Sequence, residues 1–253
     1  LSWHIRSIKN YVAHLFRLPL KTIDVVNVRF ATRVITGSYF SKRVISRIYK
    51  RKVYLVRNGV DVNLFCYKNK KKKRDPILLS VGALSTLKGH DFVIRTLART
   101  TLGKYFKFII VGNGGEDRDL LLRLGRKFGI SLDLREFISD EELIELYNKA
   151  FLLLYAPKLE PFGLVPLEAM ACGLPVLAAT RGGPKETIQL GYGWIVDRNE
   201  EVFARKIDHL IKHRSIVEER RDRVRDYVKR EWSWKKVHIQ LNEQLELAAK
   251  NKR

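Results

Sequence analysis

The chain has 253 residues, 45% of them hydrophobic and 30% charged, and its formal net charge at pH 7 is +22. This length fits one large domain, or one domain with part of another, and the apolar fraction is sufficient for a core. The two cysteines, Cys66 and Cys172, argue against a disulfide-stapled secreted protein and favour a reducing compartment. No apolar run approaches the ~18–20 residues of a membrane-spanning helix, and no signal-peptide pattern is present. Because the first residue is Leu1 rather than methionine, we expect a fragment or a processed form.

The positive charge is concentrated in the first part of the chain. Residues 1–75 contain 19 lysines and arginines against three acidic residues, a balance of +16. The remaining residues carry 30 basic and 24 acidic side chains, a balance of only +6. We expect this asymmetry to reflect an anionic partner or surface.

Residues 1–20 can form a basic amphipathic helix with Trp3 as an interfacial anchor, and residues 68–74 are typical of a solvated linker. The functional interpretation is attachment to an anionic membrane surface, where each basic side chain contributes ~1 kcal/mol. The alternative is an ordinary helix that packs on protein. Nucleic acid is disfavoured as the partner, because the sequence shows no helix-turn-helix pattern, aromatic RNA-binding motif or zinc-ligand spacing.

The elements predicted in chain order begin with a strand at 33–38, a helix at 39–49 and a strand at 53–56. From residue 76 onward, short apolar runs alternate with helical patterns. The strands predicted in this part are 77–81, 108–111, 132–137, 151–155, 175–179 and 194–196. The helices predicted there are 91–102, 116–128, 141–149, 163–172, 184–189 and 200–213. A charged helix from 215 to about 227 and a final helix that opens at 232–234 complete the chain.

Strands that are buried on both faces and alternate with helices form a doubly wound parallel sheet, the α/β Rossmann-like arrangement. Ligands bind to such sheets at the carboxyl ends of the strands. The segments that begin at Gly82, Gly112, Phe137 and Glu160 all follow predicted strands. We therefore expect these segments to line one crevice.

The segment from Glu160 to Glu168 carries the most specific chemistry. It places two carboxylates eight positions apart, with a predicted helix start at Gly163 between them. The free backbone N–H groups of Gly163, Leu164 and Val165 at such a helix start attract anions. Flanking carboxylates can accept hydrogen bonds from sugar hydroxyls. The segment therefore predicts a site for a phosphorylated sugar.

This segment resembles the E-x7-E signature of the retaining GT-B glycosyltransferases, in particular glycosyltransferase family 4, also called group 1. Residues 81–89 (VGALSTLKG), 110–114 (IVGNG) and 137–143 (FISDEEL) agree with the same family in the same order, and the resemblance covers roughly residues 34–211. It implies a GT-B fold of two Rossmann-like domains. Of the first domain only the end is present in this chain. The implied parts are the end of the N-terminal acceptor-side domain with the inter-domain segment (1–65), the C-terminal nucleotide-sugar-binding domain (66–213) and the C-terminal helices that cross back (214–253).

The resemblance also implies roles for single residues. Lys88 would contact the donor diphosphate and Glu160 the transferred sugar, and these two residues would carry catalysis. Glu168 would accept hydrogen bonds from the donor ribose. The other implied substrate-binding positions are Gly82, Phe137, Ile138, Phe162, Gly163, Leu164 and Val165. The family's usual arginine five residues before the lysine is Ala83 here, which removes one cation from the diphosphate site.

The remaining motifs are weaker. Residues 112–115 (GNGG) lack the G-x-G-x-x-G spacing of a dinucleotide-binding turn, since Asp117 occupies the last glycine position. Residues 181–186 are typical of a structural turn into a helix. The six histidines show no metal-ligand spacing and no Asp-x-Asp metal motif is present. We therefore expect no metal and no cofactor apart from the nucleotide-sugar, which would be the donor substrate.

The sequence thus predicts a retaining glycosyltransferase that moves a hexosyl group from a nucleotide-sugar donor to a glycan acceptor, either lipid-linked or polysaccharide. We expect it in the cytoplasm, as a peripheral protein on the inner face of the membrane, in polysaccharide biosynthesis. Because the family's acceptor half and its catalytic histidine belong to the first domain, we expect this chain to bind donor and to turn over poorly.

Two alternatives to this function stay open. One is a non-catalytic interaction or regulatory module that keeps the fold; Ala83 favours it, whereas the intact Lys88, Glu160 and Glu168 argue against it. The other is a protein that binds polyanions or membrane surfaces through residues 1–75.

Overall fold

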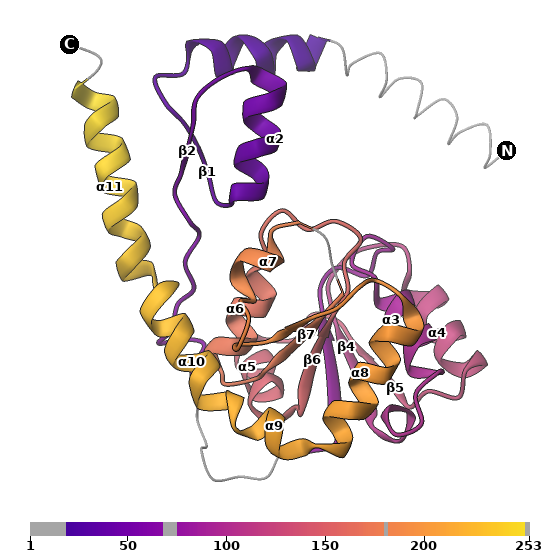
Figure 1. Ribbon diagram of the computed structural model, residues 1–253. Coiled ribbons are helices and arrows are strands. Elements are labelled where there is room, and N and C mark those ends of the chain that lie inside the picture. The colour runs from indigo at the N-terminus through magenta and orange to yellow at the C-terminus, as the bar shows by residue number, and fades with distance from the viewer. Residues whose placement is uncertain (1–18, 68–74, 180–181, 251–253) are drawn as a thin grey trace, which may run out of the picture.

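The computed structural model describes residues 19–67, 75–179 and 182–250 (Figure 1). Its main body contains a six-stranded sheet in which every pair of neighbouring strands is parallel, in the order β5-β4-β3-β6-β7-β8. The strands are β3 (Ile77–Val81), β4 (Lys107–Val111), β5 (Leu132–Arg135), β6 (Leu152–Tyr155), β7 (Val176–Ala178) and β8 (Trp194–Ile195). The doubly wound parallel sheet predicted from the sequence is confirmed.

The central strands are buried on both faces, which explains why their sequences are continuous apolar runs. Leu79 of β3 pairs with Ile109 of β4 on one side and with Leu153 of β6 on the other, and all three are buried. Successive residues of a strand point to opposite faces. These strands therefore supply alternate residues to two separate hydrophobic cores.

Helices cover both faces of the sheet (Figure 1). One core takes residues from α5 (Asp140–Lys149), α6 (Leu164–Ala171) and α10 (Arg220–Glu231). The other takes residues from α3 (His90–Leu97), α4 (Arg118–Lys127) and α8 (Glu200–Lys212). Two short helices, α7 (Pro184–Thr187) and α9 (Arg214–Glu218), and a 3-10 helix at Gly103–Tyr105 complete the body.

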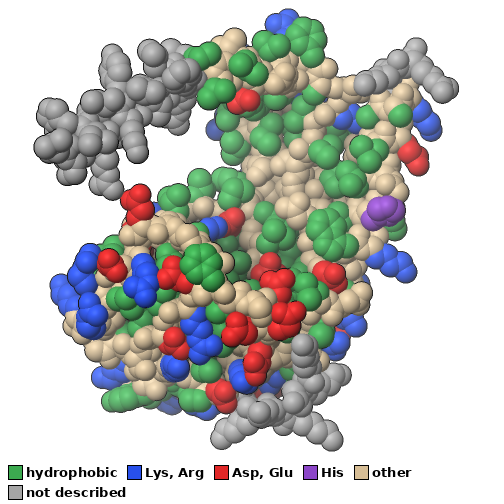
Figure 2. All heavy atoms as spheres, turned by 180° about the vertical axis from the view of Figure 1, so that it is seen from behind, with side chains coloured by type: hydrophobic (Ala, Val, Ile, Leu, Met, Phe, Trp, Pro, Cys, Tyr) green, Lys and Arg blue, Asp and Glu red, His purple; other side chains and the backbone are tan. Residues whose placement is uncertain are grey.

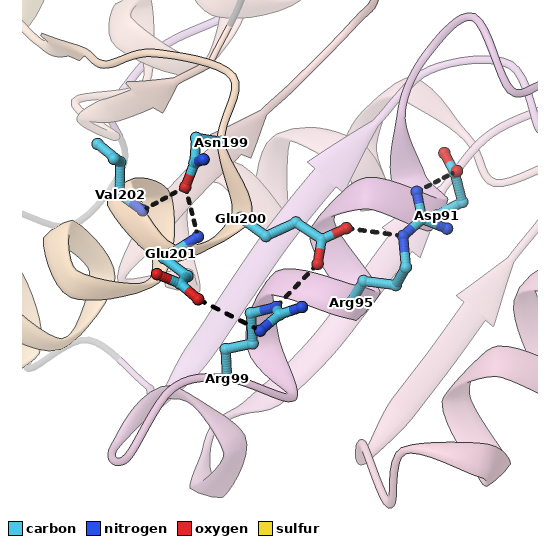
Figure 3. A network of polar contacts seen from close by, with 7 residues as sticks. All are labelled: Asp91, Arg95, Arg99, Asn199, Glu200, Glu201 and Val202. Carbon is cyan, nitrogen blue, oxygen red and sulfur yellow. Dashed lines mark hydrogen bonds and ion pairs between the residues drawn. The ribbon is translucent and has the colours of Figure 1, made fainter.

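Charged side chains join α3 to α8 (Figure 3). The Glu200 carboxylate bridges two guanidinium groups, with N–O distances of 2.9 Å to Arg95 and 2.8 Å to Arg99. Arg95 also pairs with Asp91 at 2.7 Å. These contacts fix the first turn of α8 against the outer face of α3.

The helix predicted at 91–102 is shorter than expected and ends at Leu97. The backbone N–H groups of residues 101–103 donate to the Asp208 carboxylate of α8, at 2.7–3.2 Å, instead of continuing a helix. The Thr100 hydroxyl donates to the Leu97 carbonyl, which satisfies one of the last carbonyls of α3. A tertiary acceptor therefore ends this helix, and the local sequence gives no sign of it.

The N-terminal lobe, residues 19–55, lies apart from the six-stranded sheet (Figure 1). It consists of a helix over residues 19–30, β1 (Val34–Thr36), α2 (Tyr39–Tyr49) and β2 (Val53–Leu55), with β1 and β2 paired in parallel. The predicted bounds of α2 agree with the structure, because the Ser38 side chain caps its first turn and Lys50 ends it in the left-handed region.

Among the described residues, hydrogen bonds to α11 and to α7 tie the lobe to the rest of the chain. The last helix, α11 (Trp234–Lys250), leaves the body and runs toward the lobe, where Arg33 donates to the Gln244 side chain at 2.8 Å. The Glu186 carboxylate of α7 accepts hydrogen bonds from the backbone N–H groups of Tyr39 and Phe40, both at 2.8 Å. A carboxylate at a helix N-terminus is favourable for charge as well as for hydrogen bonding.

Figure 2 shows hydrophobic side chains gathered on the part of the back surface that the lobe and α11 form. The lobe's exposed large hydrophobic residues are Leu20, Ile23, Val25, Val26, Phe30, Ile35, Tyr39, Val44 and Ile48. None of the helices within the described ranges is both long enough and apolar enough to cross a membrane. The basic linker at 68–74 lies outside the described residues. So do the first 18 residues of the amphipathic helix predicted at 1–20.

Candidate functional site

The candidate site lies where the direction of strand addition reverses. The chain passes from β3 to β4 and β5 on one side and then returns to place β6 on the other side of β3. Ligands of open α/β sheets bind beside the carboxyl ends of strands at such a switch point. The loop that follows β3 carries Lys88, and the loop that follows β6 carries Glu160.

These two residues, predicted as the catalytic pair, meet in the structure. The Lys88 Nζ atom lies 2.8 Å from Oε2 of Glu160, with the two side chains 35% and 14% exposed. The ion pair thus remains open to solvent on the lysine side. It holds one cation and one carboxylate at the switch point, separated by 72 residues of sequence.

The loop that carries Lys88 is built on close backbone approaches. Gly82 has φ +149°, and a side chain there would press on the methylene groups of Lys88. A Cβ atom on Gly89 would lie 1.9 Å from the carbonyl oxygen of Ala156, at the end of β6. The Lys158 N–H donates to the Leu87 carbonyl at 2.9 Å. The loops after β3 and β6 are therefore locked together, which fixes the direction in which Lys88 leaves the backbone.

A buried histidine supports the same loop. His90 is 1% exposed and lies between the Ser80 hydroxyl, 2.9 Å from Nδ1, and the Gly82 carbonyl, 3.1 Å from Nε2. Burial is the largest influence on the pKa of His90 and lowers it, so the ring is neutral near pH 7. A neutral ring in this position donates from Nε2 to Gly82 and accepts at Nδ1 from Ser80.

A tyrosine stands behind Glu160. Tyr155, the last residue of β6, is buried, and its pKa is raised, first by burial and then by the charge of Glu160 and a hydrogen bond to it. The Tyr155 hydroxyl is therefore protonated and donates to the carboxylate. On the other side, the Glu160 backbone forms a β-bridge with Gly182. Glu160 is held from both ends.

Helix α6 begins shortly after Glu160 in the chain, and its first turn presents backbone N–H groups that have no partner within the helix. Gly163 occupies the N-cap position in the left-handed region (φ +100°), and no side chain caps the helix. The N–H groups of Leu164 and Val165 therefore have no partner within the helix. Leu164 is exposed, whereas Val165 is half-buried and packs against the core. The helix start predicted in this segment is present.

Phe162 differs from the other predicted substrate-binding residues. Its side chain is 7% exposed and packs in the core against Trp232, with ring centroids 5.6 Å apart. Only its backbone can face the site. The aromatic ring anchors the loop to the end of α10 instead of contacting a ligand.

Glu168 lies on α6 and points toward α5. Its carboxylate accepts a hydrogen bond from the hydroxyl of Tyr147 at 3.1 Å. Burial raises the pKa of Glu168, although the Tyr147 hydrogen bond opposes this, and Asp140 raises it further. The same carboxylate raises the pKa of Tyr147, after the larger effect of that residue's burial. The two predicted glutamates are thus each backed by a buried tyrosine.

The predicted base-binding position follows β5. Phe137 has a positive φ of 54° and is 81% exposed, while Ile138 is half-buried against the core. The Phe137 N–H donates to the Asn113 side chain at 2.5 Å, which joins the loops after β4 and β5. An exposed aromatic ring held in a strained backbone conformation is available to stack on a planar ligand.

Sequence reasoning missed the residues that support the site: His90, Tyr147, Tyr155 and Asn113. Tyr155 is the one signal that was available, because it places a hydroxyl at the end of an otherwise apolar strand. Ala83 lies in the lysine loop and adds no charge there. Within the described ranges, no group of three or more His, Cys, Asp or Glu residues is placed to hold a metal ion.

Comparison with known proteins identifies the family. The model of the glycosyl transferases group 1 matches residues 65–231 of the chain. The chain belongs to this family. The matched range contains all of the predicted donor-site residues and most of the six-stranded body.

Several relatives and solved structures are similar to this chain. A glycosyltransferase of Methanocaldococcus jannaschii, MJ1607, is 27% identical over 86% of the chain and 60% of its own length. The alpha-1,3/1,6-mannosyltransferase alg2 of Schizosaccharomyces pombe is 24% identical over 76% of the chain and 46% of its own length. The chain thus spans about half of the length of such relatives.

Among solved structures, Anabaena HepE in complex with UDP and glucose matches with a TM-score of 0.80 at 23% identity, over 90% of this chain and 66% of HepE. Sucrose-phosphate synthase of Thermosynechococcus elongatus matches with a TM-score of 0.79 at 22% identity, over 89% of this chain and 60% of its own. These similarities establish the GT-B fold.

Proposed function

We propose that this chain carries the nucleotide-sugar-binding half of a retaining glycosyltransferase. The observation that carries the proposal is the Lys88–Glu160 ion pair at the switch point of the sheet, beside the uncapped start of α6. A nucleotide-sugar needs a cation and amide donors for its diphosphate, and carboxylates for the hydroxyls of its sugars. The loops after β3 and β6, together with α6, supply the cation, the amide donors and the carboxylates.

In the proposed reaction, the bond between the anomeric carbon and the diphosphate breaks, and the sugar passes to an acceptor hydroxyl with its configuration retained. Negative charge grows on the departing diphosphate as this bond breaks. Lys88 and the N–H groups of Leu164 and Val165 are fixed before the reaction and stabilise that charge. Glu160, held by Tyr155, faces the transferred sugar and stabilises positive character at its anomeric carbon.

Glu168 would accept two hydrogen bonds from the vicinal hydroxyls of the donor ribose, which suits the two oxygens of a carboxylate. Phe137 and Ile138 would lie beside the base. Because HepE was solved with UDP, uridine is the first base to test. We propose a lipid-linked or polysaccharide acceptor, at the cytoplasmic face of a membrane, with the acceptor side formed by the domain to which residues 1–65 belong.

The experiment that tests donor binding is a thermal-unfolding screen against UDP-, GDP- and ADP-sugars. A ligand that binds only the folded chain raises its stability by about 2.7 kcal/mol at a hundredfold excess over Kd. We expect one base to raise the midpoint of unfolding, and we expect Glu168→Ala to abolish this effect.

Glu246→Ala is the matched control, because Glu246 is exposed on α11. The proposal would be contradicted if no donor shifts the midpoint, or if Glu168→Ala retains the full shift.

A further inference from the structure

A second cavity lies at the outer edge of the sheet, away from the donor site. It has a volume of about 640 Å³ and is lined by residues from α7, β8, α8 and α10. Three basic side chains line it, Lys185, Lys206 and Arg220, together with the indole of Trp194. β8 is separated from β6, whose carboxyl end leads to Glu160, by β7. None of the donor-site residues lines this cavity.

The basic groups are organised around the indole ring. The Arg220 guanidinium carbon lies 4.1 Å from the ring centroid of Trp194, and the Lys206 Nζ atom lies 5.9 Å from the same centroid. Arg220 uses one N–H group on the Gly193 carbonyl, at 3.2 Å. Since a guanidinium has five N–H donors, most of them stay available. These contacts hold both cations at the wall of the cavity.

Lys206 and Arg220 have no acidic partner in the part of the chain that the structure describes. The cavity lining contains no carboxylate, and neither Lys206 nor Arg220 forms an ion pair with any described residue. Burial lowers the pKa of Lys206, and the charge of Arg220 lowers it further. Burial also lowers the pKa of Arg220, with a further effect of Arg223. Partly buried like charges without a counter-ion are unfavourable until an anion joins them.

We propose that this cavity is a second ligand site, which binds a phosphate or diphosphate group attached to an apolar or planar body. The cations provide positive charge and available N–H donors for the phosphate oxygens, since lysine and arginine are the side chains that recognise phosphate best. Trp194, Ile188 and the fully exposed Leu190 provide the apolar wall for the rest of the ligand. The volume lies in the range of small-molecule sites.

Such a phosphate group can come from a soluble metabolite or from a lipid headgroup, and the two sources need different probes. For the soluble arm, the chain is labelled with 5-fluorotryptophan and titrated with pyrophosphate, and the Trp194 resonance is assigned with Trp194→Phe. For the lipid arm, the chain is sedimented with phosphatidylcholine vesicles that contain phosphatidic acid, against pure phosphatidylcholine vesicles.

Both arms compare two double variants with the same loss of charge. The test variant is Lys206→Gln with Arg220→Gln. The control is Lys212→Gln with Lys229→Gln, because these lysines are exposed on the same two helices but do not line the cavity. All measurements are repeated with Lys88→Ala, which removes the lysine of the proposed donor site. Circular dichroism and the unfolding midpoint show that each variant is folded.

We expect pyrophosphate to shift the Trp194 resonance, or the acidic vesicles to sediment the chain. The test variant should weaken that binding at least about tenfold, and the control variant should leave it within about twofold. Which arm responds identifies the source of the phosphate group. Equal binding by the two double variants would overturn the proposal. So would the combination of an unmoved Trp194 resonance with pyrophosphate and no more sedimentation with the acidic vesicles than with pure phosphatidylcholine vesicles. Since the Lys88→Ala background keeps the expected response, failure of the donor site is distinguishable from failure of this one.

Discussion

Each of the two glutamates at the proposed donor site accepts a hydrogen bond from a buried tyrosine hydroxyl, Glu160 from Tyr155 and Glu168 from Tyr147. The pairs differ in their surroundings. Glu160 has the Lys88 ammonium at 2.8 Å. Glu168 forms no ion pair with a described residue, and burial raises its pKa. Glu168 is therefore closer to protonation than an ordinary glutamate.

This difference predicts a pH dependence of donor binding. The ionised form of Glu168 is the one that accepts hydrogen bonds from ribose hydroxyls. Because its pKa is raised above the ordinary glutamate value of 4.5, donor affinity should fall by up to about tenfold per pH unit as the pH drops below that raised pKa. The corresponding stability effect has the opposite sign. Protonated Glu168 contributes to folding below the pKa of the unfolded chain, and this contribution is lost as the pH rises through the folded pKa.

The measurement is the donor Kd between pH 7.5 and 4.5 for the wild type and for Glu168→Gln. The variant should bind the donor weakly, and its affinity should not show the fall at acidic pH that protonation of Glu168 causes in the wild type. If both proteins show the same pH profile, Glu168 does not bind the ribose in its ionised form.

At the residue scale the sequence predicts the charged groups better than their supports. Lys88 was assigned through the family resemblance of its segment, and Glu160 through the spacing of two glutamates around a predicted helix start. The role of His90 depends on Gly82 and Ser80 being brought to its two ring nitrogens by the fold. The sequence does not indicate where the Phe162 ring lies, because an apolar residue beside a helix start can face either the site or the core; the ring packs in the core.

At the element scale, polar contacts join α8 to α3 and to the residues that follow α3. Glu200 pairs with Arg95 and Arg99 (Figure 3), and Asp208 accepts a hydrogen bond from the Thr101 N–H group. Strand and helix positions were predictable because apolar runs and helical periodicity are local signals. The end of α3 at Leu97 was not, because its cause, Asp208, lies more than 100 residues away in sequence.

Asp208→Ala should lower the free energy of unfolding by about 1–3 kcal/mol, because three backbone N–H groups lose their acceptor. Asp208→Asn keeps one acceptor oxygen and should have a smaller effect. The measurement is urea unfolding at pH 7, with Asp226→Ala as the control, because Asp226 is exposed on α10. A loss for Asp208→Ala no larger than that for the control would show that this contact does not define the end of α3.

At the scale of the whole molecule, the N-terminal lobe contacts the body through few polar groups. The Glu186 carboxylate accepts hydrogen bonds from the first two N–H groups of α2, and the Gln244 side chain of α11 accepts one from Arg33. The position of the lobe was predictable only through the family resemblance, since no local pattern in residues 182–187 indicates a partner helix.

Glu186→Gln should speed hydrogen exchange of the Tyr39 and Phe40 amides by about fivefold, because a charged acceptor at a helix start is worth about 1 kcal/mol more than a neutral one. Amide exchange followed by NMR measures this directly. Glu246→Gln, an exposed change on α11, should leave the exchange of both amides unaltered. Unchanged exchange in Glu186→Gln would mean that α7 does not hold α2 in solution.

The most direct test of the central claim, that the ends of β3 and β6 form a nucleotide-sugar site, is calorimetric titration with the donor that most stabilises the chain. The account predicts saturable binding by the wild type, at least about tenfold weaker binding by Lys88→Ala, and unchanged binding by Lys104→Ala, which removes an exposed lysine elsewhere. Equal affinity of Lys88→Ala and the wild type would contradict it.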